Sequence, residues 1–189
     1  MWSPRKYGRD EVVWSKAPKI SLAGAKLLIK DQRDTRKGIM VAMEISTKHA
    51  APPYFCAPGV KINSEFYCDT MMAQHFLPHM AALKPEGFLY QQDNAPAHVS
   101  EYSRKWFAKN KVAILGGCQW PPKSADLNPC DYSLWSFMEQ QLEPGLKSEQ
   151  ELRTQILKAA SKLTPDVLDP MVRNLVKRLG RCVELREGG

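Results

Sequence analysis

Residues 90–98 read Y-Q-Q-D-N-A-P-A-H, and residues 120–135 read W-P-P-K-S-A-D-L-N-P-C-D-Y-S-L-W. The first stretch ends a short run of aromatic and aliphatic residues that begins at Phe88, and the sequence Asn94-Ala95-Pro96 interrupts this run. A strand is therefore expected to end at Asp93. Ligands of α/β proteins commonly bind at that edge of a sheet, so Asp93 is a candidate site residue.

The second stretch predicts a helix with an acid in its first turn. Asn128 has the side chain of an N-cap, and Pro129 suits the first helical position. The helical spacing i, i+4, i+7 and i+11 then places Asp131 on the same apolar, inward face as Trp135, Met138 and Leu142. An unpaired carboxylate on such a face is costly, and a bound cation would offset the cost.

Structural interpretations of the same residues stay open. Asp93 could form an Asx turn that ends the strand, and Asp131 could be a capping-box carboxylate that complements the helix dipole. His98 is expected as a hydrogen-bonded residue near a helix start, with a general-base role as the alternative. Trp120 and Trp135 are expected in the core, although tryptophans can also stack on bases.

Together with G-I-M-V-A-M at residues 38–43 and P-G-V-K-I-N at residues 58–63, the two stretches resemble the catalytic domain of mariner-type transposases, enzymes of the DDE/DDD class. The resemblance implies a ribonuclease-H-like fold, a three-layer α/β arrangement. It matches Asp93 to the family's second catalytic acid and Asp131 to its third, with 37 residues between them. In the family such acids hold Mg²⁺ or Mn²⁺, which assist the cleavage and joining of DNA.

The family's first acid is not found in this chain. In the family it lies in an opening strand, usually in the context hydrophobic-Ser/Gly-Asp-Glu-Lys. Residues 9–16 read R-D-E-V-V-W-S-K, which resembles the following strand better, and Asp10 remains the alternative first acid. The resemblance therefore implies a domain truncated at its N-terminus, with the first central strand and the helix-turn-helix domains missing. Its DNA-cutting activity is expected to be degenerate, and the alternative is a catalytically silent nucleic-acid-binding remnant.

The composition of the chain limits the classes of protein to which it can belong. With 189 residues, 43% of them hydrophobic, the chain can form one domain with a sizeable core. It has no signal peptide and no apolar run of about 18 residues, so an intracellular protein without membrane contact is expected. The resemblance implies the nucleus, DNA as the partner, and a homodimer as an option. We divide the chain into a basic arm, residues 1–37, and a catalytic domain, residues 38–189.

The patterns of apolar residues predict the elements of this domain. Strands are expected at residues 12–14, 39–45, 54–56, 88–92 and 112–115, and helices at residues 63–83 and 99–109 and from about residues 129, 148 and 164.

The basic arm is expected to bind duplex DNA weakly and without sequence preference. Residues 1–37 hold ten Lys and Arg but four Asp and Glu, a net charge of +6, against +1 for the rest of the chain. Phosphate contacts by such residues release counterions, so affinity should fall steeply with salt. Fluorescence anisotropy at rising salt measures this slope, and deleting residues 5–37 should flatten it. An unchanged slope after deletion would mean that the arm is only solvated.

Overall fold

A computed structural model describes residues 12–16, 19–21, 38–83, 87–121, 124–144, 146 and 148–187. Its strands are β1 (Val12–Lys16), β2 (Lys19–Ser21), β3 (Gly38–Ile45), β4 (Tyr54–Phe55), β5 (Leu89–Gln92) and β6 (Ala113–Leu115). Its helices are η3 (Phe66–Phe76), α1 (Leu77–Leu83), α2 (Pro96–Val99), α3 (Glu101–Lys109), η4 (Gly117–Gln119), η5 (Ala125–Leu127), η6 (Cys130–Leu134), α4 (Trp135–Gln140), α5 (Glu149–Ala160) and α6 (Pro165–Glu187). All the predicted elements are present, and β2, α2, η4 and η5 are additional.

The strands form one mixed sheet in the order β2-β3-β1-β5-β6, with β4 paired to β3. β1 runs antiparallel to β3 and parallel to β5, and β6 is also parallel to β5. The carboxyl ends of β1, β5 and β6 therefore meet at one edge of the sheet. Asp93 follows β5 at this edge, as the sequence predicts.

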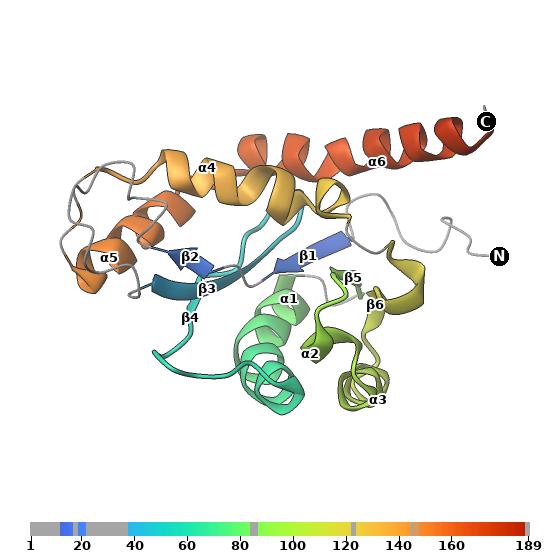
Figure 1. The fold of residues 1–189 in the computed structure, drawn as a ribbon, viewed down its shortest axis with the longest axis horizontal. Helices are drawn as coiled ribbons and strands as arrows, with labels where there is room; N and C mark the ends of the chain where they lie inside the picture. Colours follow the sequence, from blue (N-terminus) through green and yellow to red (C-terminus); the bar gives the residue numbers. More distant parts are fainter. Residues whose placement is uncertain are drawn as a thin grey trace.

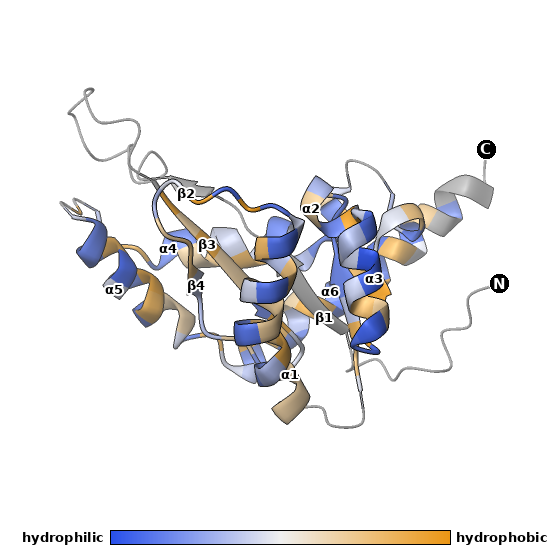
Figure 2. Ribbon diagram, turned by 90° about the horizontal axis from the view of Figure 1, so that it is seen from below, coloured by the Kyte–Doolittle hydropathy of each residue, from blue (hydrophilic) through white to orange (hydrophobic). Residues whose placement is uncertain are grey.

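Helices cover both faces of the sheet, which confirms the predicted three-layer arrangement. η6, α4, α5 and α6 lie on one side, and η3, α1, α2 and α3 lie on the other (Figure 1). The buried apolar residues form two cores, one on each face of the sheet, and β3 contributes to both. Val41, Met43 and Ile45 belong to the first core, beneath η6, α4, α5 and α6, and Ala42 belongs to the second, beneath η3, α1 and α3. This alternation is the period of two that is typical of a strand. α3 and α5 each present hydrophilic and hydrophobic residues (Figure 2), as covering helices do.

In the described part of the chain, no helix combines the length and the apolar character needed to cross a membrane.

The centre of the sheet requires a correction. We expected the first central strand to be missing, but β1 lies between β3 and β5 and pairs with both. The family's motif for this strand includes an acid, and β1 contains none, so the motif did not identify β1 as the central strand. The parallel pairing of β1 with β5 joins segments that are distant in sequence. Asp10, the alternative first acid, lies outside the described residues.

The sheet includes part of the basic arm, which changes how the arm's DNA binding should be tested. β1 and β2 both fall within residues 1–37, so deleting residues 5–37 would remove two strands of the sheet. The salt titration is therefore better made with charge-neutralising substitutions between residues 22 and 37, where Lys26, Lys30, Arg33 and Arg36 become Gln. The division into an arm and a domain stays a prediction.

A carboxylic acid lies inside the second core. Glu44 in β3 is fully buried, and Ser15 is its partner across β1. Burial raises the pKa of Glu44 well above its ordinary value, while the Tyr90 hydroxyl beside it lowers the pKa by a smaller amount. The folded protein therefore holds this carboxyl in its neutral form more tightly than the unfolded chain does.

Glu44 should make the protein less stable as the pH rises. Because the folded state binds the proton more tightly, its contribution to the free energy of unfolding is present at low pH and is lost as the pH rises through the raised pKa. Replacement by Gln keeps the shape and removes the charge, so Glu44→Gln should flatten this decline and be the more stable protein at alkaline pH. Urea unfolding across the pH range measures the effect. Glu139→Gln, on an exposed part of α4, is the matched control, and parallel pH profiles for wild type and Glu44→Gln would contradict the prediction.

Candidate functional site

Asp93 ends β5 in an Asx turn. Its Oδ1 accepts a hydrogen bond from the Ala95 N–H at 3.0 Å, and the same oxygen lies 2.7 Å from His98 Nδ1. The side chain of Asp93 keeps 25% of its surface exposed, whereas that of His98 keeps 7%. The structural interpretation of Asp93 is thus confirmed, and it leaves the carboxylate at the edge of the sheet where a ligand can reach it.

His98 lies in the short helix α2 and orients Asp93. An ionised carboxylate can only accept, so Nδ1 of His98 must donate to Asp93. The imidazole ring also packs on the ring of Tyr67, with centroids 4.4 Å apart. The expectation of a hydrogen-bonded histidine near a helix start is therefore confirmed.

A buried polar network lies behind these two residues. The Tyr67 hydroxyl donates to Gln92 Oε1 at 2.7 Å, and Gln92 Nε2 donates to the carbonyl of His98 at 3.2 Å. Burial raises the pKa of Tyr67 well above its ordinary value, so its hydroxyl keeps the proton that it donates. The network ties η3 to the end of β5 and fixes the backbone on both sides of Asp93.

Asp131 lies in the first turn of η6, as predicted. The Asn128 side chain accepts the N–H of Cys130 at 3.1 Å, and its carbonyl accepts the N–H groups of Asp131 and Tyr132. Trp135 and Met138 are buried in the first core, which fixes the helix and leaves Asp131 half-buried.

One cavity contains both predicted acids. It has a volume of about 450 Å³, and the residues that line it include Asp93, Asp131, Asn94, Ser124, Asn128 and Trp120. The cavity thus brings together a strand end and a helix start that have 37 residues between them, and the role of the two acids as site residues stays a prediction. Trp120 and Trp135 are both buried in the core, as expected.

The residues present supply two carboxylates for a metal ion. Among the described residues, no group of three or more His, Cys, Asp or Glu side chains lies close enough to hold an ion. Asp93 and Asp131 could ligate one Mg²⁺ or Mn²⁺, because hard cations take carboxylate oxygens. For the two ions that a family of three acids uses, this donor set is too small.

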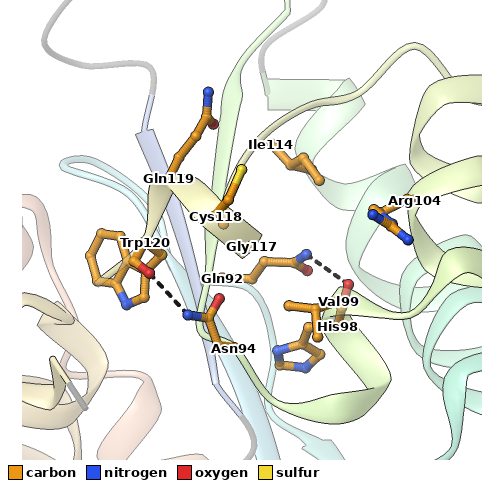
Figure 3. Close-up of a pocket in the computed structure, with 11 residues that line it drawn as sticks. Gln92, Asn94, His98, Val99, Arg104, Ile114, Gly117, Cys118, Gln119 and Trp120 are labelled. Atoms are coloured by element: carbon orange, nitrogen blue, oxygen red, sulfur yellow. Dashed lines mark hydrogen bonds between the residues drawn. The ribbon is translucent and has the colours of Figure 1, made fainter. Parts of the chain in front are cut away.

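Figure 3 shows the residues that line a second cavity, which has a volume of about 590 Å³. Asn94 and Trp120 line both cavities, and Asn94 Nδ2 donates to the Trp120 carbonyl at 2.9 Å. Gly116 lines the second cavity against Gln92, where a Cβ would come within 3.0 Å of Gln92 Cγ. The hydrogen bond from Asn94 joins two loops at the residues that the two cavities share.

Sequence reasoning missed the buried network. Gln91 and Gln92 are both fully buried in β5, and two adjacent glutamines in an otherwise apolar strand were the available signal. Buried amides need hydrogen-bond partners, but the sequence does not show that Tyr67, from a distant helix, is one of them.

Two curated transposases are similar to this chain in sequence. The transposable element Tc1 transposase of Caenorhabditis elegans is 34% identical over 99 residues, which are 52% of this chain and 35% of that protein. The Tc3 transposase of the same species is 31% identical over 127 residues, 63% of this chain and 36% of that protein. The chain spans roughly a third of the length of these two relatives. No family model matches it.

Solved structures of the Mos1 mariner transposase are similar in fold. Its catalytic domain superposes with a TM-score of 0.75 at 19% identity, covering 95% of this chain and 84% of that domain. Mos1 in a paired-end complex with the left transposon end gives a TM-score of 0.78 at 17% identity, covering 95% and 56%. The Mos1 catalytic domain has also been solved with Mn and with Mg. These matches confirm the predicted ribonuclease-H-like fold.

Removal of the Tyr67 hydroxyl should destabilise the protein by about 1–3 kcal/mol, because Gln92 Oε1 would lose its donor in a buried environment. Tyr67→Phe tests this in a urea denaturation experiment. Tyr102→Phe is the matched control, since the Tyr102 hydroxyl donates to Asp69 at an exposed position, and little change is expected. Equal stabilities for the two variants would show that the network contributes nothing.

Proposed function

We propose that the substrate of this chain is DNA. The chain has the fold of a mariner-type transposase catalytic domain and is related in sequence to Tc1-type transposases. Its role is transposition-related, and the reaction of its site is the metal-dependent cleavage and joining of DNA strands. The observation that carries this proposal is the cavity in which Asp93 and Asp131 occur together. The carboxylates come from a strand end and a helix start, two positions at which α/β proteins bind phosphate-containing ligands.

The cavity offers groups that can bind and orient a phosphodiester. Asn94 at its wall has a second amide N–H besides the one that donates to the Trp120 carbonyl, and Nδ2 of buried Asn128 has no hydrogen-bond partner among the described residues. A phosphate oxygen could accept from such a group. The net charge of +7 favours association with DNA.

Mg²⁺ or Mn²⁺ is the proposed cofactor, with Asp93 and Asp131 as its ligands. The proposal rests on the chemistry of the two carboxylates, and the Mos1 structures with Mn and with Mg support it. When bound, such an ion activates the attacking oxygen and stabilises the leaving oxygen of a phosphodiester. His98 would orient Asp93 as a ligand, because a hydrogen bond to a carboxylate fixes its direction.

Two further properties follow from DNA as the substrate. The nucleus is the proposed location. A homodimer is the proposed assembly, since the similar Mos1 protein has been solved as a paired-end complex.

The second candidate function is a catalytically silent DNA-binding remnant. The observation that favours it is the central strand, because β1 reads V-V-W-S-K and contains no acid. A chain with two acids in place of three would keep the fold and the DNA-binding charge without an efficient reaction.

The chain should cut DNA at least about 100-fold more slowly than a transposase with three acids, since even the loss of groups that only support metal ligands costs about 10–100-fold. Supercoiled plasmid with Mg²⁺ or Mn²⁺ is the substrate, and nicking is read on a gel. Asp93→Ala and Asp131→Ala separate the protein's activity from contamination. Strong nicking that both substitutions abolish would refute the prediction of impaired DNA cutting and would make Asp10 a candidate ligand again. Nicking that persists in both variants would identify a contaminating nuclease.

A further inference from the structure

The second cavity continues the site that contains the two acids. Its lining residues come from β5, α2, α3, β6 and η4 and from the loops between them. Asn94 and Trp120 also line the first cavity, in which Asp93 and Asp131 occur. The two cavities therefore meet at these two residues, and a polymer that occupies the first cavity can place its next unit in the second.

The charge of the second cavity favours an anionic ligand. Arg104 of α3 contributes an exposed guanidinium, and no Asp or Glu is among the described residues that line this cavity. Figure 3 shows Arg104 and Asn94 on opposite sides of the Gln92 side chain. Arginine binds phosphate groups well, because its planar guanidinium offers two parallel N–H donors. A strand that leaves the first cavity past Asn94 thus reaches a phosphate ligand on the far side of the second.

The walls of the second cavity suit a flat ring with a polar edge. Val99 and Ile114 present half-buried apolar side chains, and Gln119 and Asn94 present exposed amides. Asn94 donates one N–H to the Trp120 carbonyl and has a second N–H for a ligand. Amides match the donors and acceptors on the edge of a nucleobase, and apolar side chains pack on its faces. The volume of about 590 Å³ also lies within the range of small-ligand pockets, roughly 300–1,000 Å³.

We propose that the second cavity binds an unpaired nucleobase of the DNA strand whose phosphate lies at Asp93 and Asp131. The inference deepens the proposed function and rests on it for DNA as the ligand. Val99 and Ile114 hold the ring, and Arg104 binds a neighbouring phosphate of the same strand. A base enters such a pocket only when it is out of the duplex, so the site selects DNA that is single-stranded or locally melted beside the bond to be cut.

Cys118 allows the second cavity to be filled by a chemical label. This cysteine is exposed and lines the cavity, so an N-benzylmaleimide attached to its Sγ would occupy the space of the base. Cys182 is the other exposed cysteine, and it lies on α6, in the opposite layer of helices (Figure 1). The test protein is labelled Cys182→Ser, and the matched control is labelled Cys118→Ser. Mass spectrometry counts the labels, and circular dichroism establishes that both proteins are folded.

Two single strands of equal length and equal phosphate number are the ligands, one with bases and one abasic at every position. Fluorescence anisotropy in the presence of Mg²⁺ measures their affinities. Unlabelled protein should bind the strand with bases at least about fivefold more tightly, which is the lower end of what one stacked base contributes. The label at Cys118 should abolish this preference, and the label at Cys182 should leave it unchanged. Arg104→Gln should weaken the binding of both strands to the same extent, whereas Lys105→Gln, its exposed neighbour, should weaken neither.

The outcomes separate the inference from the proposed function. Equal affinity of unlabelled protein for the two strands would overturn the inference and leave DNA as the substrate. A preference for bases that survives the label at Cys118 would also overturn it, because the bases would then bind elsewhere. Unchanged binding in Arg104→Gln would overturn the assignment of a phosphate to that residue. Failure of both strands and of duplex DNA to bind would remove the proposed function, and the inference with it.

Discussion

The parallel pairing of β5 with β1 on one side and β6 on the other is the constraint on which the rest of the structure depends. It buries all four residues of β5 and leaves Asp93 as the first residue beyond the sheet. The helices of both layers pack against this centre, and η6 brings Asp131 to the same edge. The cavity is therefore a product of sheet topology, and its two acids need no direct contact with each other to be placed there.

Local signals in the sequence predicted most of the elements. The alternation in β3 and the capping sequence before α5 each depend on neighbouring residues, and the Ser148 side chain does accept the N–H of Glu151. The two acids were predicted for the same reason, because a broken strand and an N-cap followed by proline are local features. The resemblance to a family then joined two positions that periodicity alone could not bring together.

Contacts between distant segments could not be predicted from these patterns. The position of β1 depends on a parallel pairing with a strand more than seventy residues away in the sequence. The hydrogen bond from Tyr67 to Gln92 and the burial of Glu44 likewise arise from packing across layers. A polar residue in a strand signals that a partner is needed, but the fold alone decides which residue it is.

The Asx turn at the end of β5 bears on how the chain's history is interpreted. Asp93 stabilises its own turn through Ala95 and fixes the buried ring of His98. Selection for a folded protein would therefore retain this aspartate whether or not the site cuts DNA. An intact acid at position 93 is thus no record of catalysis, because the turn and the ring of His98 are enough to account for its retention.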